Sequence, residues 1–148
     1  MIIKHILLTT DLSDESQRTF ANAVAMAKTN DARITLLNVV EDLKVAAHGS
    51  PLAPPIGDPE GPALVTAAGA ALRKQSAALG ADVDVTCKAI LGTSIGEAVA
   101  DYANDNGCDI ILISTHGRTG FRRLVLGSIA DEVLRHSHVP VLCFPRAE

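Results

Sequence analysis

The fold is decided by residues 109–131, which read DIILISTHGRTGFRRLVLGSIAD. The uninterrupted apolar run at 110–113 predicts a buried strand of a parallel sheet. A connection with glycine at 117, 120 and 127 follows, and a helix is predicted from about Ser128 to His136. A buried strand, a glycine-containing loop and a helix in this order are typical of an α/β domain.

Four further runs of β-branched or aliphatic residues alternate with helical stretches along the chain. Apolar residues at helical spacing predict a helix capped by Ser13 and another that stops at Asn106-Gly107, and an alanine-rich stretch at 63–79 predicts a third, ended by Gly80. The third strand run alternates apolar and polar residues, which is typical of an edge strand. The five predicted strands are residues 2–9, 33–39, 83–90, 109–114 and 139–144.

These elements predict one α/β domain over residues 1–148. Because parallel crossovers are right-handed, the expected architecture is a doubly wound, five-stranded parallel sheet of order 3-2-1-4-5 with helices on both faces. Ligands of such sheets bind outside the carboxyl ends of the strands, here where strands one, two and four end. The connection at 41–62 holds five of the seven prolines, and a lid and an unconstrained insertion remain alternatives for it.

Composition excludes several classes of protein. With 148 residues, 47% of them hydrophobic and 20% charged, the chain is long enough to bury a core without disulfides or metals. A net charge of −4 argues against a general nucleic-acid or anionic-membrane binder, because such binding requires a surplus of cations. The sequence has no apolar run of the length that a membrane span requires, and its three cysteines cannot all pair with one another. We therefore expect a soluble cytoplasmic protein.

The loop after the fourth strand has the chemistry of an anion site. Glycines permit positive φ and let backbone N–H groups approach a bulky anion, and a helix N-terminus carries partial positive charge. Residues 114–129 contain three arginines and no acidic residue, and Arg118 is the best placed of the three for phosphate. Ser128 has a second interpretation, because Ser128-x-x-Asp131 matches a capping box in which the hydroxyl serves its own helix. The Walker sequence and the dinucleotide-binding G-x-G-x-x-G are both absent from the sequence.

This loop resembles the signature of the universal stress protein family. In the nucleotide-binding branch of that family the pattern G-x2-G-x9-G-[S/T] follows the fourth strand. Gly117, Gly127 and Ser128 match its later positions, and Ser114 stands at the first, where the family has glycine. The likeness covers nearly the whole chain, including ILLTTDLS at 6–13, LLNV at 36–39 and HVPVL at 138–142.

The resemblance implies an adenine-nucleotide site. It places Asp11 beside the adenosine moiety, the main chain of Val39 at the adenine, and the glycine loop with the following helix start at ribose and phosphates. Asp11 has a second interpretation as a turn residue, and Val39 and Ile113 are core residues first, so that their ligand contacts would come from the backbone. The predicted nucleotide contacts are Thr10, Asp11, Val39, Ile113, Ser114, Gly117, Arg118, Gly127, Ser128 and Ile129.

The resemblance also implies an assembly and a role. It implies a homodimer formed through the last strand, from Val139 to Phe144, and stress-related regulation through a protein partner that the sequence does not identify. An apolar strand at the sheet edge needs covering, and self-pairing is the simplest way to cover it.

Three classes of function are compared. The leading hypothesis is a regulatory protein that binds ATP, or ADP or AMP, with or without Mg2+; slow hydrolysis stays open, and no residue is assigned as catalytic, because none is an evident general base. The alternative is a nucleotide-free, partner-binding protein of the same fold, which Ser114 supports. A phospho-receiver is disfavoured, because the third strand ends at Gly92 without an acceptor carboxylate. An adenylating enzyme of the pyrophosphatase type is disfavoured as well, because the first strand is not followed by Ser-Gly-Gly-x-Asp-Ser.

Overall fold

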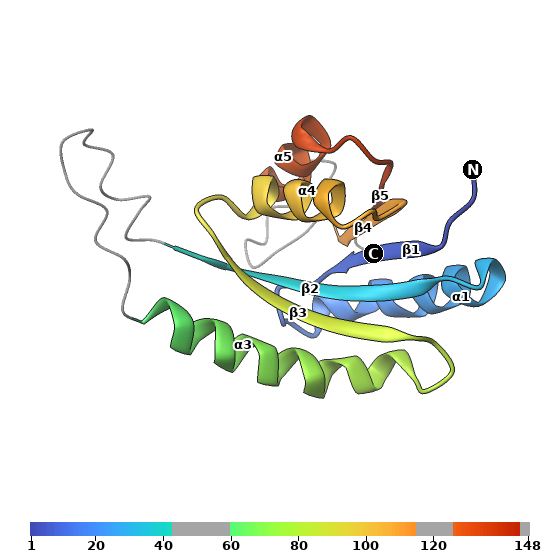
Figure 1. The fold of residues 1–148 in the computed structure, drawn as a ribbon, viewed down its shortest axis with the longest axis horizontal. Helices are drawn as coiled ribbons and strands as arrows, with labels where there is room; N and C mark the ends of the chain where they lie inside the picture. The colour runs from blue at the N-terminus through green and yellow to red at the C-terminus, as the bar shows by residue number, and fades with distance from the viewer. Residues whose placement is uncertain (43–59, 115–125, 146–148) are drawn as a thin grey trace.

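The computed structural model describes residues 1–42, 60–114 and 126–145, and its strands and helices alternate along the chain (Figure 1). The helices confirm the predicted stops: α3 continues into the short 3-10 helix η2, which ends at Gly80 with φ 80°, and α4 ends before Gly107 with φ 62°. The elements are β1 (His5–Thr9), η1 (Glu15–Thr19), α1 (Phe20–Asn30), β2 (Arg33–Glu41), α3 (Gly61–Ser76), η2 (Ala77–Leu79), β3 (Val85–Gly92), α4 (Ile95–Asp105), β4 (Ile110–Ser114), α5 (Ser128–His136) and β5 (Val141–Phe144).

All five strands form one parallel sheet in the order β3-β2-β1-β4-β5, as predicted. The central strand β1 pairs with β2 from His5↔Arg33 onward and with β4 at Leu8↔Leu112. The sequence order of the strands reverses at β1, so the switch point lies between β1 and β4. The predicted edge strand, β3, is one of the two edges, and β5 is the other.

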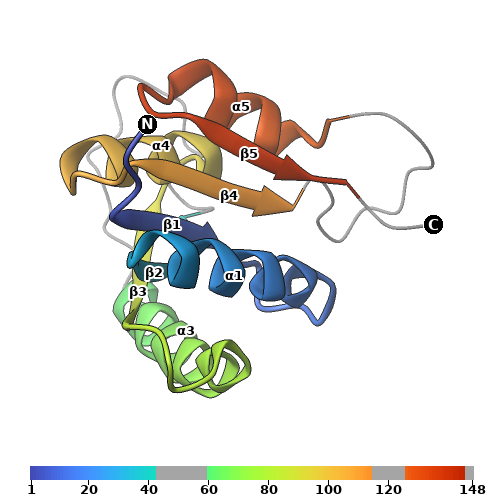
Figure 2. The ribbon, with the colours of Figure 1, turned by 90° about the vertical axis from the view of Figure 1, so that its right-hand side faces the viewer.

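Helices cover both faces of the sheet (Figure 2). Alternate residues of β1 serve the two faces: Ile6 and Leu8 pack in a core with α1 and α3, and Leu7 packs in a core with α4 and α5. All three of these side chains are fully buried. Strands that are covered on both faces need apolar residues at every position, which explains the continuous apolar runs in the sequence.

Four strands begin later than predicted, β4 by a single residue at Ile110, because strand pairing rather than hydrophobicity sets their start. β1 begins at His5, and Ile2, which was assigned to it, is 80% exposed. β3 begins at Val85 rather than 83. β5 begins at Val141 rather than 139, because Pro140 has no N–H to donate to the sheet and contributes only its carbonyl, which accepts from Ile111 N at 2.9 Å.

The first helix also differs from the prediction. Ser13 does not cap an α-helix; a 3-10 helix, η1, precedes α1, which begins only at Phe20. Ser13 Oγ accepts a hydrogen bond from Ser16 N at 3.3 Å, so the hydroxyl serves the 3-10 turn instead. The polar sequence after β1 favours tight local turns, because short hydroxyl side chains compete for backbone N–H groups.

Candidate functional site

The carboxyl ends of β2, β1 and β4 meet at the switch point, where the sequence places the site. Thr10, just after β1, donates its N–H to the Leu37 carbonyl at 3.0 Å and accepts from Asn38 Nδ2 at 2.9 Å through its own carbonyl. On the other side, Thr9 Oγ1 donates to the Leu112 carbonyl at 3.4 Å. The end of β1 is therefore held to both neighbouring strands.

The main chain of Val39 points past the end of β1. Odd-numbered residues of β2 face β1: Arg33 N donates to the Lys4 carbonyl at 3.0 Å, and the Leu37 carbonyl receives the Thr10 N–H. Val39 continues this alternation, but β1 has already ended at Thr9. Its side chain is buried at 8% exposure in the core, as predicted. The structure thus leaves the Val39 main chain directed toward the switch point.

Asp11 lies in a tight turn that follows β1. Its Oδ1 accepts hydrogen bonds from Ser13 N at 3.0 Å and from Ser13 Oγ, so the interpretation as a turn residue is confirmed. Leu12 within the turn has φ 67°, a conformation that side chains disfavour. Thr10 is buried at 6% exposure, and its Oγ1 accepts from Leu12 N at 3.0 Å. Both bonds to Ser13 use one carboxylate oxygen of Asp11.

The start of α5 corrects two expectations. Gly127, not Ser128, is the N-cap residue, and its carbonyl accepts the first intrahelical bond from Asp131 N at 2.9 Å. Ser128 is the first helical residue and is exposed, so the capping-box interpretation of its hydroxyl is wrong. Gly127 has φ −60° and ψ 151°, an ordinary extended conformation, so positive φ does not explain this glycine. The N–H groups of the first turn, including that of Ile129, lack intrahelical acceptors in any helix.

Ile113 and Ser114 end β4 beside β5. Ile113 pairs with Cys143 and is 5% exposed, which confirms its place in the core; Ser114 pairs with Phe144 and is half-buried. Because Ser114 has a regular strand conformation, the backbone accommodates serine where the family pattern has glycine. Two further predicted contacts, Gly117 and Arg118, lie outside the described residues.

The acidic side chains near the start of α5 have structural partners. Glu132 Oε2 accepts from Gly96 N at 3.1 Å and so serves the N-terminus of α4, and Asp131 Oδ2 accepts from Arg135 Nε at 2.8 Å. Within residues 1–42, 60–114 and 126–145, no cluster of three or more His, Cys, Asp or Glu forms a metal site. No sequence pattern predicts the Glu132 contact, because its partner lies 36 residues away on another helix.

A cavity of about 880 Å³ lies at the opposite, amino edge of the sheet. Its charged lining is largely paired: Lys4 Nζ lies 3.5 Å from Asp31 Oδ2, and Lys28 Nζ lies 3.0 Å from Asp82 Oδ2. At the opposite, carboxyl edge, β2 and β4 are followed along the chain by residues 43–59 and 115–125, which the structure does not describe. We therefore place the candidate site by the ends of the strands and not by the size of the cavity.

The strand order, the two helical layers and the switch point define a doubly wound α/β protein. The model of the Universal stress protein family matches residues 3–145, and the chain belongs to this family. Universal stress protein MJ0531 of Methanocaldococcus jannaschii is 30% identical over 145 residues, which cover 95% of this chain and 81% of that protein.

Solved structures support the same fold. The structure of MJ0577, a universal stress protein of the same archaeon, has a TM-score of 0.79 at 23% identity and covers 100% of this chain and 99% of its own. A universal stress protein in complex with cAMP has a TM-score of 0.69 at 19% identity, with 98% of both chains covered.

Of the described helices, none is long and apolar enough to cross a membrane.

Proposed function

We propose that this universal stress protein binds an adenine nucleotide, ATP or its products ADP and AMP, and acts as a regulatory switch in the stress response. The observation that carries the proposal is the meeting of three features at one sheet edge: the Asp11 turn, the Val39 main chain pointing past β1, and the start of α5. The similar structure that contains cAMP supports an adenine nucleotide as the ligand.

The described residues fit such a ligand. Val39 offers main-chain groups to the adenine edge, and the Asp11 carboxylate suits the hydroxyl donors of a ribose. The first-turn N–H groups of α5 suit phosphate, because they combine unpartnered donors with the positive end of the helix dipole. Thr10, Ile113 and Ser114 form the adjoining wall in this proposal, and Gly117 and Arg118 complete the phosphate side.

The proposal assigns binding and no catalytic residue. Mg2+ is commonly held by one or two carboxylates together with substrate phosphates, so a bound metal ion and slow hydrolysis remain part of what the experiment decides. The three cysteines are free thiols, which suits the reducing cytoplasm. We extend the proposal to one domain over residues 1–148 that works as a homodimer with a regulatory protein partner.

Calorimetry with ATP and AMP tests the proposal. We expect one nucleotide per chain for the unmodified protein, and at least about tenfold weaker ATP binding for Gly127→Val, because the added branched side chain at the N-cap obstructs the approach of phosphate to the helix. A Gly69→Val variant, in the middle of α3, controls for the general effect of the substitution. Unchanged ATP affinity in Gly127→Val would refute the site.

Ser114 favours a second candidate function, a nucleotide-free module that binds a protein partner. In the family pattern the first glycine leaves bare backbone, whereas a serine side chain here occupies space beside the expected phosphates. Acid extraction of the purified protein, followed by chromatography, distinguishes the two candidates. A copurified adenine nucleotide excludes the second, and a calorimetric titration without heat, at millimolar ATP, excludes the first.

A further inference from the structure

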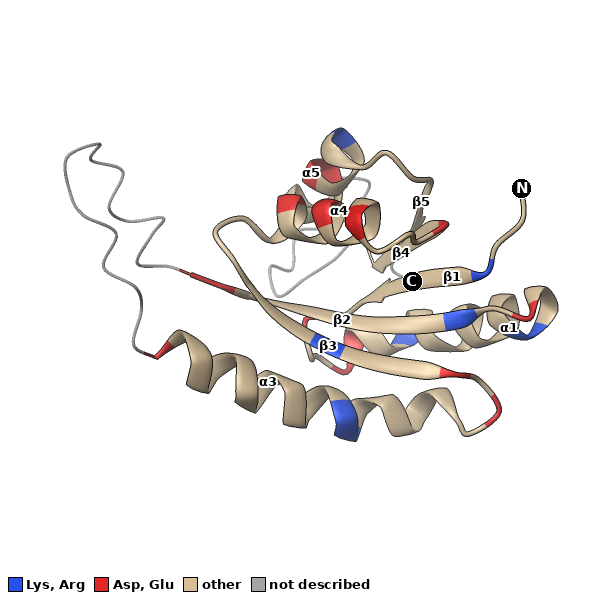
Figure 3. Cartoon of the chain, viewed as in Figure 1, with Lys and Arg blue, Asp and Glu red and all other residues tan. Residues whose placement is uncertain are grey.

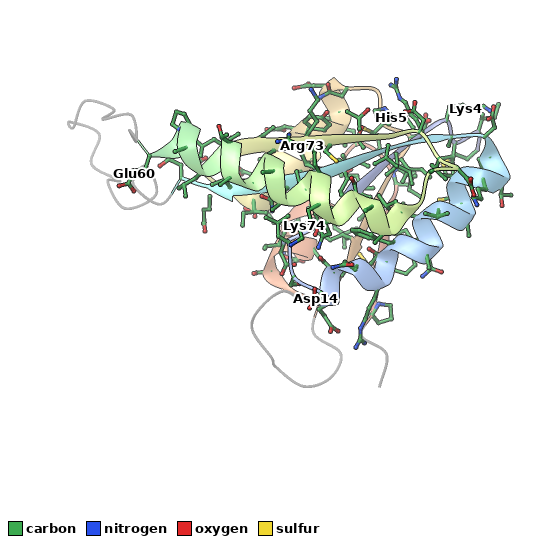
Figure 4. The ribbon with its side chains drawn as sticks, turned by 90° about the horizontal axis from the view of Figure 1, so that it is seen from below. Lys4, His5, Asp14, Glu60, Arg73 and Lys74 are labelled. Atoms are coloured by element: carbon green, nitrogen blue, oxygen red, sulfur yellow. The ribbon has the colours of Figure 1, made fainter. Side chains whose placement is uncertain are left out.

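One amide on α3 spans the turn that carries Asp11. Gln75 Oε1 accepts from Thr10 Oγ1 at 2.7 Å, and its Nε2 donates to the Ser13 carbonyl at 3.2 Å. Thr10 and Ser13 lie on either side of the Asp11–Leu12 pair, and Gln75 follows Ser13 by 62 residues. In Figure 4 the neighbouring Lys74 points toward the side of the molecule where Asp14 lies, and Arg73 points away from it.

The chemistry of the partners fixes the orientation of the amide. The Ser13 carbonyl only accepts, so the NH2 group of Gln75 must face it. The Gln75 oxygen then faces the Thr10 hydroxyl, which donates to it. Both ends of the amide are therefore used in one orientation, and a carboxylate of the same shape would lack the donor to Ser13.

A buried hydroxyl completes the network. Ser16, 2% exposed, has one hydroxyl proton for two acceptors: its Oγ lies 2.7 Å from the Ser13 carbonyl and 2.7 Å from Thr10 Oγ1, whose own proton goes to Gln75. Most of these hydrogen bonds are partly buried, so a broken bond leaves a polar group that solvent reaches only in part. The network connects β1, η1 and α3.

The turn needs such support because of its backbone. Leu12 has φ 67°, and a residue with a Cβ adopts a positive φ only at an energetic cost. Residues in such conformations persist only where their surroundings hold them. The Leu12 N–H is held by Thr10 Oγ1, which is in turn held by Gln75.

We propose that Gln75 is a positioning residue for the nucleotide site: its amide holds the turn from Thr10 to Ser13 and so presets the Asp11 carboxylate for the ligand. This inference rests on the proposed function. Gln75 contacts the turn and not the ligand, so it acts through preorganisation, which raises affinity by lowering the ordering cost at binding. It also makes the last turn of α3 a part of the site's framework.

Two variants and one control test the inference by calorimetry. Gln75→Met keeps the length of the side chain and removes both hydrogen bonds, and Gln75→Glu keeps the acceptor for Thr10 but loses the donor to Ser13. The control is Gln17→Met, because the Gln17 side chain, also beside the turn, donates to Asp14 Oδ1 at 3.3 Å in a local, exposed bond. We expect both Gln75 variants to bind AMP and ATP about tenfold more weakly, and the control to stay within about twofold of the unmodified protein.

The pattern across nucleotides separates an effect at the nucleoside end of the site from one at the phosphates, and hydrogen exchange separates a local effect on the turn from general damage. Because Asp11 is expected at the nucleoside end, the Gln75 variants should lose affinity for AMP and ATP by the same factor, whereas Gly127→Val should affect ATP more than AMP. In hydrogen exchange without nucleotide, the Leu12 and Ser13 amides of Gln75→Met should exchange faster than those of the unmodified protein. In Gln17→Met their exchange rates should be unchanged. If Gln75→Met does not fold, Gln75→Glu is compared with the unmodified protein and with Gln17→Met instead.

The outcomes distinguish this inference from the proposed function. If the unmodified protein binds AMP and ATP and both Gln75 variants bind them equally well, the positioning role is refuted while nucleotide binding stands. If the unmodified protein binds neither nucleotide, the proposed function fails and the inference fails with it. Weaker binding of AMP and ATP by an equal factor supports the inference.

Discussion

His5, the first residue of β1, is buried at 6% exposure with its ring fully engaged. Its Nε2 lies 2.8 Å from Thr35 Oγ1 and 3.7 Å from Cys108 Sγ, and its Nδ1 lies 3.1 Å from Arg33 Nη2. A guanidinium only donates, so Nδ1 must accept and the imidazole is neutral. Burial and the Arg33 charge lower the pKa of His5, although the nearby Asp109 carboxylate opposes them.

This arrangement predicts a loss of stability in acid. The folded protein resists protonation of His5 more than the unfolded chain does, whose histidine titrates near 6.5. The contribution of neutral His5 to the free energy of unfolding is therefore complete above pH 6.5. It is lost as the pH falls below 6.5, toward the lowered pKa of His5 in the folded state. Urea unfolding at pH 7.5 and pH 5.5 measures this loss. In a His5→Gln variant the difference between the two pH values should shrink, and an equal difference in both proteins would contradict the assignment.

The roles of some single residues could be predicted from the sequence, and those of others could not. Val39 and Ile113 were correctly identified as core residues, and the alternative interpretation of Asp11 as a turn residue agrees with its bonds to Ser13. Each of these roles follows from the residue's place at the end of a strand. Gln75 gave no signal, because its partners lie 62 and 65 residues away and an amide in an alanine-rich helix is an ordinary surface residue. Contacts between distant elements form only when the sheet brings those elements together.

At the scale of elements, α4 and α5 are in close contact at Gly96. A Cβ built on Gly96 would lie 2.6 Å from Glu132 Cβ, and the Gly96 N–H donates to the Glu132 carboxylate. Ser94 caps the same helix, accepting from Glu97 N at 3.4 Å. The N-terminus of α4 therefore has one partner from its own sequence and another from α5.

Two glycine substitutions should consequently have opposite effects. Gly96→Ala should lower the free energy of unfolding by about 1–3 kcal/mol, because the new methyl group forces α5 away. Gly69→Ala, inside α3, should raise it by about 0.5–1 kcal/mol, because the nearest atom to its Cβ is 3.6 Å away and alanine is the better helix former. Denaturant unfolding of both variants tests the pair. A Gly96→Ala variant as stable as the unmodified protein would contradict the close contact between Gly96 and Glu132.

Element types were predicted better than element limits, for a physical reason. The strands are continuous apolar runs because helices cover both faces, and the helices stop at Gly80 and Gly107 because both have positive φ. The starts of β1 and β5 depend on which backbone groups find partners, and the 3-10 helix before Phe20 is accompanied by local hydroxyl–backbone bonds such as Ser16 N to Ser13 Oγ. Neither the strand starts nor the 3-10 helix can be predicted from hydrophobic periodicity.

At the scale of the whole molecule, charge and apolar surface are unevenly distributed. On one face of the sheet, α4 carries acidic residues along its length, and α5 carries both acidic residues and a basic one (Figure 3). These acids are Glu97, Asp101, Asp105, Asp131 and Glu132. On this face the described chain is anionic, so the cationic ligand contacts that the proposal needs must come from the glycine loop and the start of α5 rather than from the helix surface.

The two edges of the sheet differ in the same way. The β3 edge exposes Thr86 and Lys88, and a charged edge strand discourages pairing with another sheet. The β5 edge reads Val-Leu-Cys-Phe and carries no charge, and Leu142 is 37% exposed. An uncharged apolar edge strand favours pairing with a second copy, which is the homodimer that the proposed function includes.

Light scattering of a Leu142→Lys variant tests this assembly. The unmodified protein should have the mass of two chains, and the variant should have the mass of one, because a charge on β5 opposes pairing with an identical strand in which the same charge is present. Thr86→Lys is the matched control, since it adds the same charge to the other edge and should leave the dimer intact. Leu142 is already partly exposed, so lysine there disturbs the core little, and circular dichroism of both variants verifies the fold. A monomeric unmodified protein at micromolar concentration, or a Leu142→Lys variant that remains dimeric, would exclude the β5 edge as the interface.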